Sequence, residues 1–215
     1  MLSAWADIAQ NVSVILASLF AIYGIDSWRR EFVGKRQMEL AEEVLALFYQ
    51  ARDIIQAIRS PLGYEGEGAT RKPAPSERPE DKDALDHAYA LIERYNKHVE
   101  TFSRIHALRY RFMAQIGVAA AQPFSDLNKV VNDLILASRR MARLSTRPTR
   151  TLRTEADLEK YDRERNQVEA VFYSGEEADP ITPRVDAIIA NIEQTCRGLI
   201  ESRGTLFALL NRRIK

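Results

Sequence analysis

The segment Ile8–Ile25, IAQNVSVILASLFAIYGI, determines how this chain is organised, because it carries no charged residue. A tryptophan lies on each side of it, Trp5 and Trp28. A helix rises about 1.5 Å per residue and the hydrocarbon core of a bilayer is about 30 Å thick, so about 20 apolar residues cross it. Aromatic residues are typical of the membrane interface. The segment therefore predicts a single-pass transmembrane anchor within residues 1–28.

A signal peptide and a buried helix of a soluble domain are two other interpretations of this segment. A cleavable signal peptide needs a basic region before its apolar run, and the first seven residues contain no Lys or Arg. A buried helix of a soluble domain is the stronger rival, since Gln10, Asn11, Ser13 and Ser18 dilute the hydrophobicity. Against it, the run is apolar around most of its circumference instead of along one stripe. The anchor is the favoured interpretation.

The orientation of the anchor follows from the charges around it. Arg29, Arg30, Lys35 and Arg36 come directly after the segment, and no Lys or Arg precedes it. The positive-inside rule then puts the N-terminus outside and the C-terminal domain in the cytoplasm, as in a protein of the bacterial inner membrane. The lone Cys196 suits a reducing compartment, since one thiol cannot form an internal disulfide.

The rest of the chain, residues 29–215, predicts an all-α fold. The chain has 31 basic and 30 acidic residues and only 9 Gly and 8 Pro, and no stretch alternates as a strand does. Short connections between amphipathic helices predict an antiparallel cytoplasmic bundle of about five helices, with a flexible Gly/Pro-rich loop at residues 60–81. The expected helices run from the anchor to about Arg59, from residues 80–83 to Ile116, from Pro123 to Ser145, from Thr154 to about Phe172, and from Thr182-Pro183 nearly to the C-terminus.

No motif in the sequence names a reaction. His87, His98 and His106 lie on one expected helix without the Glu-x-x-His spacing of a di-iron bundle, and rim positions are the simpler interpretation. The Gly63-x-x-Gly66-x-Gly68 stretch contains glutamates instead of a lysine and follows no strand, so it does not resemble a phosphate loop. Cys196 lies on an apolar seam. We therefore expect no enzymatic activity, cofactor or metal.

One charge feature is distinctive, a series of arginines with no acidic residue among them. Guanidinium groups bind phosphate in a bidentate manner, so the series is a candidate basic partner site. No aromatic residues are interleaved with it and acidic stretches follow it, which favours internal pairing or a solvated loop and does not favour nucleic acid. The series consists of Arg139, Arg140, Arg143, Arg147, Arg150 and Arg153.

Small residues recur every fourth position within the anchor, at Ala9, Ser13, Ala17 and Ala21. This small-xxx-small spacing lets two helix backbones approach closely in a membrane. The ladder predicts a homo-oligomer that self-associates through this face.

Together these features favour a membrane-anchored, non-enzymatic helical scaffold or protein-interaction module that contacts the lipid bilayer, other copies of itself and a protein partner of unknown identity. The alternative is a membrane-perturbing effector, whose anchors oligomerise under control of the cytoplasmic bundle. Loss of membrane potential on ectopic expression would distinguish the effector from the scaffold. An enzyme with a metal site at His87 is a third hypothesis, which metal analysis would test.

Overall fold

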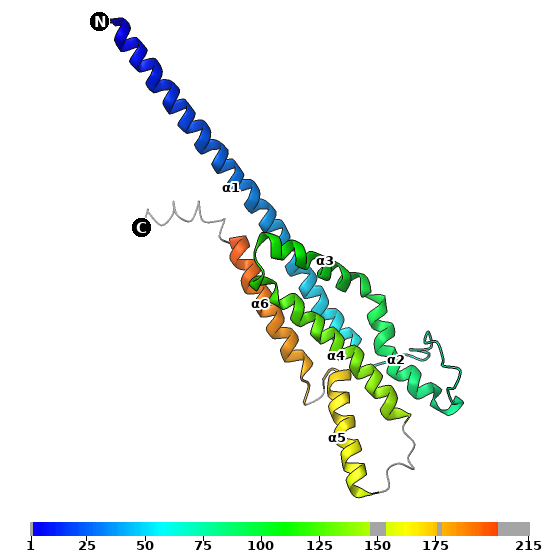
Figure 1. Ribbon diagram of the computed structural model, residues 1–215. Helices are drawn as coiled ribbons and strands as arrows, with labels where there is room; N and C mark the ends of the chain where they lie inside the picture. Colours follow the sequence, from blue (N-terminus) through cyan, green and yellow to red (C-terminus); the bar gives the residue numbers. More distant parts are fainter. Residues whose placement is uncertain (1, 147–153, 176–177, 202–215) are drawn as a thin grey trace. The chain divides into compact units, whose positions relative to one another are not determined.

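The computed structural model describes residues 2–146, 154–175 and 178–201, with backbone alone at residues 2–12, 26 and 27. Within these residues it is all-α, with six α-helices, two 3-10 turns and no strand (Figure 1). The all-α prediction is confirmed. The elements are α1 Leu2–Ile58, η1 Pro79–Asp81, α2 Lys82–Lys97, α3 Val99–Gln115, η2 Ala119–Ala121, α4 Gln122–Ser145, α5 Glu155–Phe172 and α6 Ile181–Glu201.

The spanning helix of the prediction is not confirmed. Where side chains are described, no helix has a stretch both long enough and apolar enough to cross a membrane. The first five residues of the expected span, residues 8–12, lie outside the described side chains.

The chain divides into two compact units, one of residues 43–197 and the other of residues 1–42 with 198–215. The unit of residues 43–197 contains the helical bundle. Its core is formed by the apolar stripes of the end of α1, α2, α3, α4, α5 and α6. The most deeply buried of these side chains include Val44, Phe48, Leu91, Phe112, Leu127, Val130, Ile181 and Ile192.

Some consecutive helices of the bundle lie end to end. In Figure 1, α2 and α3 follow one another along one column, and α5 leads into α6 along another. The helix α4 contacts α2, α3 and α5. The Tyr161 hydroxyl of α5 donates to the Leu144 carbonyl at 3.3 Å, and Arg184 of α6 donates to Asp133 at 2.8 Å. The order of these contacts along α4 shows that α5 and α6 run antiparallel to it.

The expected second helix is divided at His98, and this corrects the sequence prediction of about five helices. His98 has φ −120° and ψ 11°, and its N–H donates to the Tyr95 carbonyl, as in a 3-10 turn. No glycine or proline marks the position. The apolar seam continues across the break, with Leu91 and Phe102 both buried. The pattern of apolar residues therefore could not reveal the break, which tertiary packing imposes.

The starts of the later helices follow local signals. Pro123 lies in the first turn of α4, and Thr154 with Asp157 forms a reciprocal capping box at α5, as the sequence predicts. At α6 the signal is different from the expected threonine cap. The Asp179 carboxylate accepts the N–H groups of Ile181 and Thr182, at 2.8 and 3.2 Å.

Candidate functional site

The predicted basic series lies at the C-terminal end of α4 and beyond it. Arg139, Arg140 and Arg143 are exposed on α4. Arg140 and Arg143 line an open groove of about 840 Å³ between α4, α5 and the start of α6, whereas Arg139 does not. The other three members of the series, Arg147, Arg150 and Arg153, lie outside the described residues.

Three further cations line the same groove, which we call the basic groove, and the sequence interpretation missed them. Lys160 and Arg163 come from α5 and Arg184 comes from α6. Among the residues that the structure describes, two carboxylates line the groove, those of Asp133 and Glu164. The local spacing of Lys160 and Arg163 gave no hint of this, because the cations of α4 and α5 meet only through tertiary packing.

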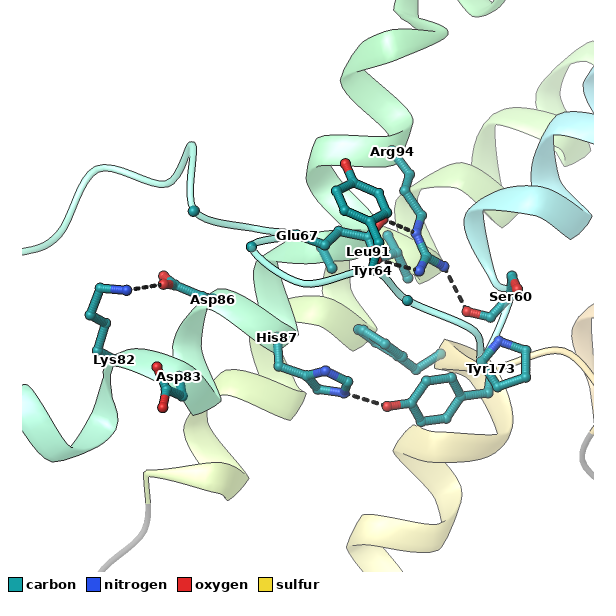
Figure 2. Close-up of a pocket in the computed structure, with 16 residues that line it drawn as sticks. Ser60, Tyr64, Glu67, Lys82, Asp83, Asp86, His87, Leu91, Arg94 and Tyr173 are labelled. Atoms are coloured by element: carbon teal, nitrogen blue, oxygen red, sulfur yellow. Dashed lines mark hydrogen bonds and ion pairs between the residues drawn. The ribbon is translucent and has the colours of Figure 1, made fainter.

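A second cavity, of about 290 Å³, lies where the loop at residues 60–81 packs on α2 and on the end of α5 (Figure 2). Arg94 organises one of its walls. The Arg94 guanidinium donates to both oxygens of Glu67 at 2.6 Å, and also to the carbonyls of Ile58, Ser60 and Leu62 at 2.6 to 3.1 Å. The hydrogen bonds from Arg94 lower the pKa of Glu67, against the effect of burial. This pair therefore ties the loop to α2 and to the end of α1.

The neighbouring Glu93 holds the loop from a buried position. Its carboxylate accepts from the Thr70 hydroxyl at 2.7 Å, the Gly68 N–H at 3.0 Å and the Tyr64 hydroxyl at 3.2 Å. These hydrogen bonds, led by that of Thr70, lower the pKa of Glu93. Residue 68 must be glycine, because its φ is +86° and a Cβ on it would lie 1.9 Å from the Asp86 carbonyl oxygen.

A third set of ion pairs holds the far end of the loop. Arg71 donates to both oxygens of Glu77 at 2.6 and 2.7 Å and to Asp86 at 2.9 Å, and Lys82 also donates to Asp86 at 2.9 Å. The pKa of Arg71 is raised, chiefly by the hydrogen bonds to Glu77. The sequence predicts a flexible loop at residues 60–81. The structure gives this segment a dense set of partners on α2, which we call the paired loop cluster: Glu67, Arg71, Glu77, Asp86, Glu93 and Arg94.

His87 lines the cavity of Figure 2. Its Nε2 lies 2.5 Å from the Tyr173 hydroxyl, and its ring stacks on Phe172 (Figure 2). Asp83, four residues earlier, lines the same cavity. Among the side chains that the structure describes, no three His, Cys, Asp or Glu residues are grouped to hold a metal ion.

Arg59, at the end of α1, is buried and joins α5 to α6. It donates to the carbonyls of Ala170 and Val171 at the end of α5, each at 2.9 Å. It also pairs with Asp179, with the nearest nitrogen and oxygen 2.7 Å apart. Burial raises the pKa of Asp179, but the hydrogen bonds from Arg59, Thr182 and the start of α6 outweigh burial and lower it to about 2.

Cys196 is fully buried on α6, as the apolar seam predicts. Burial raises the pKa of its thiol to about 12. At neutral pH the thiol stays protonated, and a protonated buried thiol is a poor nucleophile.

The N-terminal part of α1 differs from all other helices in its exposure. From Ser13 to Ile25 every side chain is exposed, and none is charged. The exposed fraction reaches 74% for Phe20 and 66% for Ile25. Of the small-residue ladder, Ser13, Ala17 and Ala21 lie on this exposed stretch, and Ala9 lies outside the described side chains.

No family model matches the chain, and neither the curated proteins nor the solved structures contain a significant match.

Proposed function

We propose that this protein is a membrane-attached, non-enzymatic helical module. The N-terminal part of α1 enters the bilayer and self-associates there, and the bundle serves as a scaffold for a protein partner. The observation that carries the proposal is the stretch Ser13–Ile25, which is uncharged and exposed at every position.

An exposed stretch of this kind needs a cover. Burying a Leu, Ile or Phe side chain is worth about 1.5 to 3 kcal/mol, and monomeric soluble proteins rarely leave large contiguous apolar patches in water. The exposed fractions of Leu16, Leu19 and Ile22 are 50%, 58% and 65%. Because the exposure goes all round the helix, a partner that covers one face would leave the others in water. A bilayer covers every face.

The residues that follow the stretch suit the membrane interface. Trp28 is 68% exposed and stacks on Phe32, with ring centroids 6.0 Å apart. The Arg36 guanidinium lies over the Phe32 ring at 4.8 Å. Amphipathic aromatic rings and cations next to an apolar helix are typical of the headgroup region, where anionic lipids attract Lys and Arg.

A scaffold role for the bundle is supported by how its charged groups are used. In the cavity of Figure 2, Glu67, Asp86 and Arg94 are already held in ion pairs that fix the loop. The thiol of Cys196 is buried and protonated. These groups stabilise the fold and are not poised as acid, base or nucleophile.

Membrane fractionation of the full chain tests the attachment. We expect the protein in the membrane fraction, resistant to 1 M salt and alkaline carbonate and released by detergent. Leu16→Lys together with Phe20→Lys moves it to the soluble fraction or prevents its accumulation. The matched control is Leu62→Lys, at a loop position that is 82% exposed, and it leaves the protein in the membrane. Release of the unaltered protein by salt alone contradicts the proposal.

Cross-linking in membranes tests the self-association separately. We expect a cross-linked oligomer that is lost on replacing Ser13 and Ala17 by Ile, because larger side chains keep the two backbones apart. Leu19→Ile lies on the opposite face of the same helix, and it preserves the oligomer. If the double variant cross-links as well as the unaltered chain, the ladder is not the contact face.

A further inference from the structure

We propose that the basic groove between α4, α5 and α6 binds a small molecule that carries two or more phosphate groups next to an apolar portion. This site is separate from the membrane attachment proposed above, and it combines residues from three helices.

The side chains that line the groove are mainly positively charged. Arg140, Arg143, Lys160, Arg163 and Arg184 face it, against Asp133 and Glu164. A concave surface lined mainly by one sign of charge focuses the electrostatic potential and concentrates ions of the opposite sign. The groove therefore attracts anions, although the whole chain is almost neutral, with a net charge of +1.

These cations differ in whether an acidic side chain pairs with them. Arg184 pairs with Asp133 at 2.8 Å, and Arg163 lies 3.9 Å from Glu159 in a pair that is mostly exposed. Among the described residues Arg140, Arg143 and Lys160 have no acidic partner within ion-pair distance. Their donors are available to a ligand, and guanidinium groups bind phosphate through parallel hydrogen bonds.

Aliphatic side chains, which we call the apolar floor, also line the groove. Leu136, Leu144, Val168 and Val171 line it between the cations, and Leu136 is 39% exposed. A volume of about 840 Å³ is within the usual range of small-molecule sites, about 300 to 1,000 Å³. The cations and the apolar floor together fit a ligand that has phosphate groups at one end and an apolar body at the other.

Such chemistry is found both in nucleoside triphosphates and in the headgroups of phosphorylated lipids. Calorimetric titration of the full chain in detergent distinguishes them, with ATP, adenosine, inorganic tripolyphosphate and a short-chain phosphatidylinositol bisphosphate as probes. We expect at least one phosphorylated organic probe to bind more tightly than tripolyphosphate, and adenosine not to bind. The tighter of the two organic probes then identifies the source.

Variants locate the binding in the groove. The double variant Arg140→Gln, Arg143→Gln weakens the binding of the preferred probe by at least about 10-fold. Each charge-assisted hydrogen bond contributes more than enough free energy for that factor. The matched control is Arg139→Gln, one residue away on the same helix and outside the groove, and it retains the affinity. Circular dichroism checks that both variants keep their helices.

Three results would overturn the proposal. Equal weakening by Arg139→Gln and by the double variant would show nonspecific attraction to a basic surface. If tripolyphosphate binds as tightly as the organic probes, the apolar floor contributes nothing to binding. A DNA duplex that binds more tightly than every small probe would assign the groove to nucleic acid instead.

Discussion

The paired loop cluster and the basic groove contain similar side chains, but they use them in opposite ways. In the cluster, Arg94 donates hydrogen bonds to Glu67 and to three carbonyls, and the side chain of Glu67 is only 7% exposed. In the groove, Arg140 and Arg143 are exposed and have no acidic partner among the described residues. A charge that is paired inside the protein stabilises the fold, whereas an unpaired exposed charge costs little stability and is available for binding.

Removal of one arginine from each region tests this comparison. Arg94→Gln leaves the nearly buried Glu67 without its partner and frees three carbonyls, so we expect a loss of about 3 to 5 kcal/mol in the free energy of unfolding. Arg140→Gln should change it by less than about 0.5 kcal/mol. Urea unfolding of the full chain in mild detergent, followed by circular dichroism, measures both.

Equal effects of these two substitutions would contradict the comparison. The exposed pair Arg78–Asp81, in the same loop, provides a further control. Arg78→Gln should cost much less stability than Arg94→Gln, because half of the Arg78 side chain is exposed.

The next largest effect concerns how closely the loop approaches α2. Gly68→Ala places a methyl group against the Asp86 carbonyl and forces a left-handed conformation on alanine, so we expect a loss of about 3 kcal/mol. Gly66 has a similar φ, +80°, with open space around it. Gly66→Ala should cost only about 1 kcal/mol.

Thermal unfolding monitored by circular dichroism compares the two glycine variants. Limited proteolysis adds a local measurement, since Gly68→Ala should make residues 60–81 the first segment to be cut. Identical stabilities of the two variants would mean that the loop is not held against α2 in solution.

The smallest of the three effects is a dependence of stability on pH, at the ion pair of Asp179 with Arg59. The pKa of Asp179 is lowered to about 2, from an ordinary value of 3.8. A lowered pKa contributes stability that is complete above pH 4 and is lost as the pH falls toward 2. The difference corresponds to about 2 kcal/mol.

Asp179→Asn isolates this contribution from those of the other carboxylates. We expect the variant to be less stable than the unaltered protein at pH 6, and the difference to shrink between pH 4 and pH 2. Urea unfolding at a series of pH values measures it. A difference that stays constant over this range would show that Asp179 is not the group that titrates.

Much of the fold could be predicted from local signals. The capping box of Thr154 and Asp157 and the early proline of α4 confirm two helix starts, and the predicted ends near Arg59 and Ser145 are within a residue of those observed. The division of α2 from α3 at His98 could not be predicted, because no breaking residue lies there and the apolar seam runs through it.

The candidate site could be predicted only in part. The arginine series drew attention to Arg140 and Arg143, but Arg139 does not line the groove and three other members lie outside the described residues. Lys160, Arg163 and Arg184 were missed. They come from other helices, and a pattern along one helix carries no information on what faces it.

The sequence by itself determined the helical class, most helix boundaries and the uncharged run at the start of α1, because periodicity, caps and charge act over a few neighbouring residues. Only the tertiary structure decided which charges are paired and which are left open. Ion pairing depends on distances through space. The bundle brings Glu67 to Arg94 and Asp179 to Arg59, while it gathers the cations of α4, α5 and α6 around one groove.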